Sequence, residues 1–333
     1  MFLRIRRLPY NVPIEEIQRI ALITDTTLNI MAQIVLSVYL SILTKKQCFT
    51  LFHPNLSILF INQALTYFFF FNAELTQNIR NLIAGKFLQP SGFFFYVNVA
   101  VDVGIYSIAL NLISFVIERL CAAIKFATYE HWCSTVPYLG IAISVAQWII
   151  SISLLAASRA GYLRSVLLVS FILIAYFVAL VVFLVLPSAS RALYERHMRM
   201  QHNANFKHSL TVRYQLSTNV SNAKLLNKIV LFISVTSVAG LLVFCIANYV
   251  VDEFPSRLLN EVFSIFISLQ AIFMCCITVR CKKRLYHELR RMLCRLKKEK
   301  SHFVPRTVDG RTLVVPVTDE KRLYFAMYER YWR

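Results

Sequence analysis

The sequence predicts an all-α fold, a bundle of seven membrane-spanning helices. Of the 333 residues, 57% are hydrophobic and only 16% are charged, whereas a soluble domain carries about 25% charged residues. A helix that crosses a hydrocarbon core of about 30 Å needs roughly 20 apolar residues, and seven stretches of the chain have that length. Lipid is therefore the expected solvent for most of the chain. The seven stretches are 20–43, 55–75, 93–117, 134–157, 165–187, 227–250 and 258–279.

The second stretch is the weakest of the seven. Asn62, Gln63 and Asn72 interrupt it, and such polar residues lower its hydropathy. Its central sequence, LTYFFFFN at 65–72, is nevertheless strongly apolar and aromatic. We therefore predict a helix that faces lipid here as well.

The connections divide the chain into one membrane domain with flanking segments. Most connections are short, and the only long one between spans is at 188–226. No internal repeat and no linker rich in Gly, Ser or Pro marks a second domain. The predicted segments are an N-terminal segment at 1–19, the seven-span domain at 20–279, a juxtamembrane amphipathic helix at 280–300 and a tail at 301–333.

The basic residues predict the orientation in the membrane. The chain has 36 Lys and Arg against 17 Asp and Glu, a net charge of +19, and cytoplasmic connections carry an excess of Lys and Arg. The tail, the alternate connections that share its side and Lys228 at the start of the sixth stretch hold 27 of the 36, of which the tail holds 16. We therefore expect the N-terminus outside and the tail in the cytoplasm. Two N-x-[ST] sequons, at Asn55 and Asn219, then lie inside, where they stay unmodified.

Seven spans, an outer N-terminus and basic inner connections are the outline of a G-protein-coupled receptor. Channels and transporters with seven spans share this outline, so a ligand-gated channel or transporter is the alternative function. A receptor-like protein that aids trafficking without binding a ligand is a further alternative. Spans broken by Gly or Pro, which are typical of transporters, are scarce in a chain with 7 Gly and 9 Pro.

Two acidic residues lie in apolar surroundings within the spans. Asp25 is in the first stretch and Asp102 is in the third, and an acid at membrane depth is costly and marks a functional position by default. Asn29 lies one turn from Asp25 and shares its helix face, so we interpret Asp25 and Asn29 as a polar clamp between helices. Asp102 lies in the outer half of its span, where a ligand pocket would open, and is the better candidate for binding a ligand.

The segment FVIERLCAAIKFATYEHW (115–132) begins with the last residues of the third stretch, which places Glu118 and Arg119 at the cytoplasmic boundary. An acid beside an arginine there is able to act as a releasable latch. The arginine pairs locally at rest and then turns into a cavity that opens for a partner helix. The alternative is an arginine that reaches lipid phosphates at the interface. The residues alone leave these two interpretations evenly balanced.

Residues 280–300, RCKKRLYHELRRMLCRLKKEK, follow the seventh stretch directly. They predict an amphipathic helix that lies along an anionic inner leaflet. Cys281 and Cys294 are candidates for palmitoylation there, or else unmodified thiols in a reducing compartment. The apolar face would comprise Leu285, Leu289, Met292, Leu293 and Leu296.

Other classes of function lack support in the sequence. The eight cysteines form no C-x-x-C pair, and no His/Cys set has the spacing of a metal site. His197, His202 and His208 are too widely spaced for the paired ligands of a membrane metalloenzyme. The positive charge lies between apolar runs rather than on a nucleic-acid-binding module. We therefore predict no enzyme activity, no metal, no cofactor and no nucleic-acid partner.

Three segments, in order along the chain, resemble one known family. They are ERLCAAIKFATYE (118–130) at the end of the third stretch, RYQLSTN (213–219) before the sixth, and DGR (309–311) followed by LYF (323–325) and Trp332. In these segments, and over nearly its whole length, the chain is similar to the nematode serpentine chemoreceptors of the Sre family. That family forms one superfamily with Sra, Srab and Srb. Thr218 departs from the resemblance, because the similar segment has glutamate there.

The resemblance implies a receptor in the plasma membrane of sensory cilia that detects an external small molecule and signals through a heterotrimeric G protein. We expect the ligand near Asp102, Tyr96 and Tyr106. The sixth stretch lacks C-W-x-P and the seventh lacks N-P-x-x-Y, so the activation switches of rhodopsin-like receptors do not transfer. The residues expected to contact the G protein are Glu118, Arg119, Tyr129, Arg213 and Tyr214.

Overall fold

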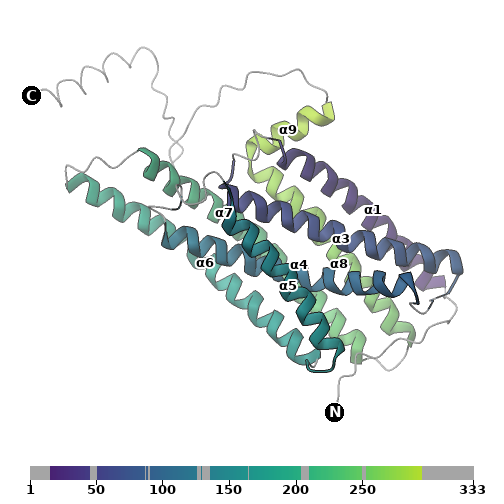
Figure 1. The fold of residues 1–333 in the computed structure, drawn as a ribbon. Coiled ribbons are helices and arrows are strands. Elements are labelled where there is room, and N and C mark those ends of the chain that lie inside the picture. Colours follow the sequence, from purple (N-terminus) through teal and green to yellow (C-terminus); the bar gives the residue numbers. More distant parts are fainter. Residues whose placement is uncertain are drawn as a thin grey trace, which may run out of the picture.

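The described part of the chain is entirely helical in outline (Figure 1). The computed structural model describes residues 16–45, 51–86, 88, 91–125, 129, 136–163, 165–203, 210–249 and 253–294. These residues form eight helices. They are α1 (Glu16–Leu43), α3 (Pro54–Ala84), α4 (Phe93–Ile124), α5 (Tyr138–Arg159), α6 (Ser165–Asn203), α7 (Leu210–Tyr249), α8 (Glu253–Cys281) and α9 (Lys283–Cys294).

Seven of these helices are long and apolar enough to cross a membrane, which confirms the predicted seven-span bundle. The second stretch is a true span within α3, because its polar residues face the bundle interior or bond to their own helix. Asn62 and Gln63 are buried, and the exposed Asn72 donates a hydrogen bond to the carbonyl of Phe68 at 2.7 Å. Asn62 is also hydrogen-bonded, to Gln147 and Trp148 of α5, and polar groups satisfied in these ways are tolerated in a lipid environment. Gln63 differs, because its buried Oε1 has no partner among the described residues.

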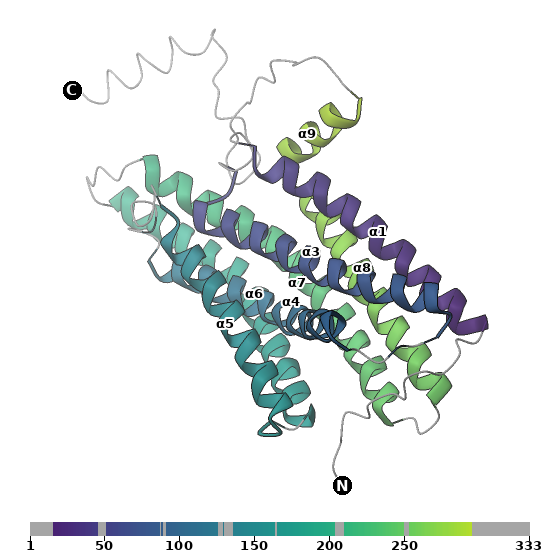
Figure 2. The ribbon, with the colours of Figure 1, turned by 45° about the vertical axis from the view of Figure 1, so that its right-hand side comes forward.

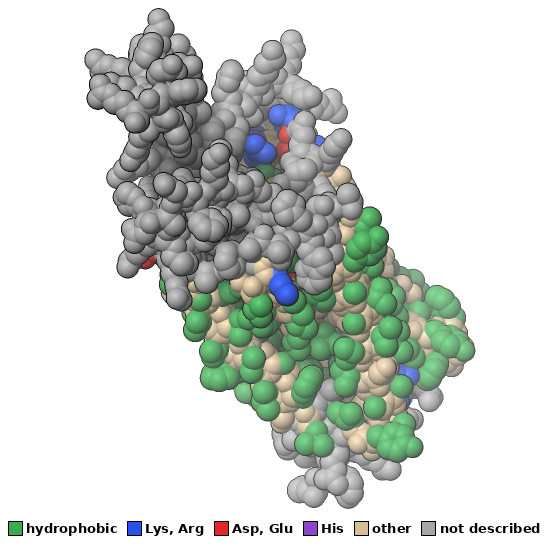
Figure 3. Space-filling model, turned by 60° about the vertical axis from the view of Figure 1, so that its left-hand side comes forward, with side chains coloured by type: hydrophobic (Ala, Val, Ile, Leu, Met, Phe, Trp, Pro, Cys, Tyr) green, Lys and Arg blue, Asp and Glu red, His purple; other side chains and the backbone are tan. Residues whose placement is uncertain are grey.

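Helix α3 contacts three other helices, as Figures 1 and 2 show. It packs against α1, α4 and α5, while α8 packs against α1 and α7, and α6 pairs with α7. Aromatic residues fill the space between α3 and α4, where the ring centroids of Phe60 and Phe115 lie 5.1 Å apart. On the outside, hydrophobic side chains cover most of the described surface in Figure 3. Exposed apolar area on this scale indicates a surface that faces lipid.

Two glycines allow α3 to approach its neighbours closely. A Cβ on Gly140 of α5 would lie 2.6 Å from the backbone oxygen of Asn55, and one on Gly104 of α4 would lie 2.9 Å from Cβ of Phe70. Both distances are shorter than van der Waals contact. Small residues at such crossings let membrane helices pack backbone to backbone, and Gly140 lies next to the candidate site described below.

The long connection expected at 188–226 is mostly helix, which corrects that expectation. α6 continues to Asn203, beyond its apolar span Val169–Leu186, and α7 begins at Leu210, before its span Leu225–Ile246. At 1.5 Å per residue, the extensions add roughly 25 Å and 22 Å, and they project from one end of the bundle (Figures 1 and 2). A polar helix of this kind is stabilised by pairs such as Arg191 and Glu195, 3.0 Å apart at i, i+4.

The amphipathic helix predicted after the seventh span is α9. Leu285 is fully buried and Leu289 packs against the core, whereas Arg284 and Tyr286 are exposed. Glu288 accepts a hydrogen bond from Lys45 at 3.2 Å, which ties α9 to the end of α1. The apolar face of α9 is therefore turned toward the bundle and its basic face away from it.

Candidate functional site

Glu118 and Arg119, near the end of α4, form a buried ion pair. The Nε and Nη2 groups of Arg119 donate to the two carboxylate oxygens of Glu118. Glu118 is 0% exposed and Arg119 is 3% exposed. Two charges removed from water are tolerated only when each is paired and hydrogen-bonded. Arg119 therefore turns back onto its neighbour rather than outward to lipid phosphates.

Tyr129, in the segment after α4, completes this pair. Its hydroxyl donates a hydrogen bond to Oε1 of Glu118, and its backbone N–H donates to the carbonyl of Lys125 at 2.8 Å. Burial, together with the negative charge of Glu118, raises the pKa of Tyr129 well above its ordinary value. Tyr129 therefore remains a neutral phenol and keeps its proton for this hydrogen bond.

Asn55, at the start of α3, connects the cluster to two other elements. Its Nδ2 donates to the Tyr129 hydroxyl at 3.3 Å, and its Oδ1 accepts from the backbone N–H of Gly140 at 3.1 Å. α3 begins here because Pro54 occupies the first turn and His53 caps it, with Nδ1 accepting from the Asn55 N–H at 3.4 Å. Burial lowers the pKa of His53 to about 4, so its imidazole is neutral at physiological pH.

A second cation lies near the pair. Lys282, between α8 and α9, donates to Oδ1 of Asn222 at 2.8 Å and lies 5.2 Å from the ring centroid of Phe52. Burial lowers the pKa of Lys282 to about 8, and the positive charge of Arg119 acts in the same direction. The cluster thus combines two cations with one carboxylate. We define it as the latch cluster: Asn55, Glu118, Arg119, Tyr129 and Lys282.

Gln147 of α5 is the centre of a second polar network in the middle of the bundle. Its Nε2 donates to the carbonyl and hydroxyl oxygens of Ser107 at 2.9 and 3.1 Å, and to Oδ1 of Asn111 at 2.9 Å. Its Oε1 accepts from Asn62 at 3.1 Å and from Ser114 at 2.8 Å. One glutamine thereby links α3, α4 and α5. The sequence carries a signal for it, a lone amide within an apolar span.

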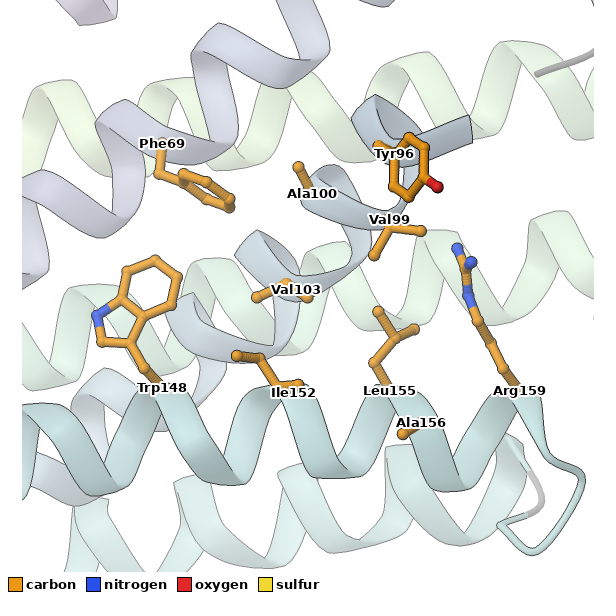
Figure 4. A pocket seen from close by; sticks show the side chains of 10 residues that line it. All are labelled: Phe69, Tyr96, Val99, Ala100, Val103, Trp148, Ile152, Leu155, Ala156 and Arg159. Atoms are coloured by element: carbon orange, nitrogen blue, oxygen red, sulfur yellow. The ribbon is translucent and has the colours of Figure 1, made fainter. Parts of the chain in front are cut away.

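A groove of about 550 Å³ lies between α3, α4 and α5. Figure 4 shows Phe69 and Trp148 at one end of it and Tyr96 and Arg159 at the other. The walls between these ends are apolar, and ligand sites generally combine such walls with a few polar groups. The wall residues are Val99, Ala100, Val103, Ile152, Leu155 and Ala156.

The residues predicted to bind a ligand lie at or near the groove. Tyr96 lines it and is 71% exposed. Asp102 accepts a hydrogen bond from Arg159 at 2.7 Å, and both side chains are about one third exposed. Tyr106 lies one turn further along α4 and packs against the core instead of lining the groove. Sequence reasoning missed Arg159, because it lies just beyond the fourth predicted stretch.

Asp25 and Asn29 are fully buried and join α1 to α3. Oδ2 of Asp25 accepts from Asn78 at 2.7 Å, and Nδ2 of Asn29 donates to Oε2 of Glu74 at 3.2 Å. Ser264 of α8 donates to the other carboxylate oxygen of Glu74. The sequence did not single out Glu74, because the second predicted stretch ended beside it, at residue 75.

The remaining predicted site residues are only partly described. Arg213 and Tyr214 lie within α7, but their side chains fall outside the described part of the structure, as does that of Cys294. Cys281 is an exposed free thiol at the end of α8. Within the described ranges, no group of three His, Cys, Asp or Glu residues is close enough to hold a metal ion.

Comparison with protein families gives a match over most of the chain. The model of the family described as Sre G protein-coupled chemoreceptor matches residues 75–333, more than three quarters of the chain. The matched range includes all three segments in which the resemblance was seen, at 118–130, 213–219 and 309–332. A comparison with curated proteins gave no match.

Proposed function

The chain belongs to the Sre family of G protein-coupled chemoreceptors, and from that premise we propose that it binds an external small molecule and signals through a heterotrimeric G protein. It is a multi-pass membrane protein and a seven-span chemosensory receptor. The observation that carries the proposal is the latch cluster, a buried ion pair at the helix end where a transducer would dock. We place the receptor in the plasma membrane of sensory cilia.

The orientation in the proposal has the N-terminus outside and the latch cluster in the cytoplasmic half. The excess of Lys and Arg supports it, and so does Asn55. This residue belongs to a sequon, yet it is 0% exposed and both atoms of its amide are hydrogen-bonded. A glycan, which is added on the outer side, would be incompatible with this packing. The position of Asn55 is therefore consistent with a cytoplasmic start of α3.

Arg119 is held in a resting position by Glu118 and Tyr129 in this proposal. When the helices repack, Arg119 leaves Glu118, and together with Lys282 it presents positive charge to a partner. A helix that inserts by its C-terminal end would suit this site, because the negative end of its dipole points at the cations. The extensions of α6 and α7 project from the same end of the bundle and would flank such a helix, with Arg213 and Tyr214 on α7.

The ligand in this proposal occupies the groove beside Asp102 and Tyr96, with Tyr106 behind it. Aromatic rings and aliphatic walls would hold an apolar body, and the Asp102–Arg159 pair would exchange hydrogen bonds with a polar group. On the cytoplasmic side, α9 would place its basic face on an anionic leaflet. Cys281, as an exposed thiol, would be accessible to palmitoylation, with Cys294 as the second candidate.

The test is expression of the full chain in cells with a panel of small molecules and a G-protein activation assay. We expect a ligand that evokes a response in the wild type and not in Arg119→Ala at equal surface level. The matched control is Arg19→Ala, which replaces an exposed arginine near the start of α1 and should keep the response.

A response that survives in Arg119→Ala contradicts the latch. A ligand-evoked current that persists without G protein favours the alternative function, a ligand-gated channel or transporter. An epitope tag at residue 1 that is labelled only in permeabilised cells shows that the N-terminus is inside and contradicts the proposed orientation.

A further inference from the structure

The groove between α3, α4 and α5 has a wall that is exposed on the outside of the bundle. Ile152, which lines the groove, is 55% exposed. It continues a row of exposed apolar side chains on α5 that includes Val145 and Ile149, because positions i, i+4 and i+7 share one helix face. α5 packs against α3 and α4, and this row is turned toward the surrounding lipid. A ligand of the groove therefore has a path through the bilayer.

Two aromatic rings form the inner end of the groove. Phe69 of α3 and Trp148 of α5 meet edge to face, with centroids 5.3 Å apart, and Figure 4 shows both at the end opposite Arg159. The indole N–H of Trp148 donates to Oδ1 of Asn62 at 3.1 Å, so the polar atom of the ring is already satisfied. Trp148 thus offers the groove an apolar surface, which suits the end of a hydrocarbon chain.

The end of the groove that the proposed orientation places outside carries a charge. Arg159, in the last turn of α5, lines this end and donates to Asp102 of α4 at 2.7 Å. A guanidinium has five N–H donors in a planar fork, so Arg159 is able to hold a second carboxylate beside Asp102. Tyr96, which lines the same end, and Tyr162, three residues after Arg159, are both exposed. Aromatic side chains of this kind collect at the level of the lipid head groups, which places the cation of the groove at that level.

The length of the groove matches one leaflet of the bilayer. Trp148 and Arg159 are 11 residues apart on α5, which is roughly 16 Å at 1.5 Å per residue. A hydrocarbon core of about 30 Å gives each leaflet about 15 Å. An extended chain of about twelve carbons is about 14 Å long, because each carbon–carbon bond of about 1.5 Å advances the chain by about 1.25 Å. The distance from the charge to the aromatic end therefore suits one acyl chain of medium length.

We propose that the ligand of this groove is a single-chain amphiphile with a carboxylate head, which reaches the groove through the outer leaflet. The head lies against Arg159, the chain follows the apolar walls, and its end contacts Phe69 and Trp148. Since the chain leaves lipid for a wall that is equally apolar, the ion pair with Arg159 is what selects this ligand from the bilayer. This inference rests on the proposed function in taking the groove as the ligand site, and it adds the class of the ligand and its route.

The test follows the fluorescence of Trp148 in the purified full chain in lipid nanodiscs. Trp132→Phe and Trp332→Phe leave Trp148 as the only one of the 3 tryptophans. Dodecanoate with bromine on its terminal carbon, which quenches a nearby indole, is titrated into the discs. We expect quenching that saturates and is reversed by unlabelled dodecanoate, whereas dodecanoate with bromine beside the carboxyl group should quench far less. Quenching that rises without saturation, or equal quenching by both isomers, would overturn the proposal.

Matched variants on α5 decide whether the groove holds the chain. Ala156→Phe fills the groove from an exposed position and should abolish the saturable quenching. Ala146→Phe, at a position that is also exposed on α5 but does not line the groove, should keep it. Undiminished quenching in Ala156→Phe would place the chain elsewhere and contradict the proposal.

The head group is tested at Arg159. Arg159→Gln should raise the half-maximal concentration by roughly tenfold or more, because a charge-assisted hydrogen bond is lost. Lys86→Gln, at an exposed cation just after α3, is the matched control and should leave that concentration unchanged. An unchanged concentration in Arg159→Gln would contradict the assigned head site. Displacement by lysophosphatidylcholine as effective as that by dodecanoate would overturn the carboxylate and assign the groove to phospholipid chains.

The quenching assay is independent of the proposed signalling, because it needs no G protein. Its failure would overturn the amphiphile and leave the proposed receptor function standing. Dodecanoate that binds saturably but evokes no G-protein response would support the amphiphile and count against the proposed function alone.

Discussion

Replacing Tyr129 by Phe removes one hydroxyl from the latch cluster and keeps the ring. That hydroxyl donates to the carboxylate of Glu118 and accepts from Asn55, while the ring lies 4.1 Å from that of His53. A hydrogen bond to a charged group contributes about 1.5–3 kcal/mol. Since each 1.4 kcal/mol is a factor of ten in an equilibrium constant, the substitution should raise the equilibrium constant for release of Arg119 by roughly 10- to 100-fold.

The expected result is signalling without a ligand. A minor state populated at about 0.1–10% becomes substantial when the resting state loses this much stability. The measurement is basal G-protein activation per receptor at the cell surface, and Tyr138→Phe, at an exposed tyrosine, is the matched control. If Tyr129→Phe lowers the unfolding midpoint but leaves basal activation at the wild-type level, the cluster supports the fold only and the latch reasoning is refuted.

Two further predictions concern stability. Gln147→Leu removes five hydrogen bonds, and at about 0.6 kcal/mol for each bond between membrane helices it should cost roughly 3 kcal/mol; an unchanged thermal midpoint would contradict this. The second concerns Lys282, whose pKa is lowered by burial to about 8 from 10.5. Between these values the unfolded chain binds more protons, so the stability of the wild type relative to Lys282→Met should rise with pH from 8 to 10.5 and stay level below pH 8. A flat difference across that window would exclude a buried Lys282.

The seven spans could be predicted because hydropathy depends on composition within one segment. The helical extensions of α6 and α7 could not be predicted in the same way, because a polar helix gives no hydropathy signal and residues 188–226 therefore resemble a connection. α3 shows the intermediate case. Its polar residues lower the hydropathy of residues 55–75. They are tolerated because partners such as Gln147, which bonds to Asn62, lie on another helix. The sequence of one segment does not reveal such packing.

Site residues could likewise be predicted only where the local sequence marks them. Glu118 and Arg119 were identifiable because they are adjacent and lie at a span end, and Asp25 because it lies among apolar residues. The role of Asn55 could not be identified from the sequence, because it depends on hydrogen bonds with Tyr129 and Gly140, which are distant in the chain. The assignments of Glu118, Arg119 and Tyr129 to coupling remain predictions, as do those of Asp102, Tyr96 and Tyr106 to the ligand.

α3 is the element that connects these separate networks. Near its start Asn55 bonds to Tyr129 and Gly140, in its middle Asn62 bonds to Gln147, and near its end Glu74 bonds to Asn29 of α1. A helix is stiff along its axis, so a shift of α3 relative to α5 strains the bonds of Asn55 and Asn62 together. The groove is lined by Phe69 of the same helix. A ligand bound in the groove as proposed would therefore act, through one rigid helix, on the hydrogen bond between Asn55 and Tyr129, which helps hold Tyr129 against Glu118.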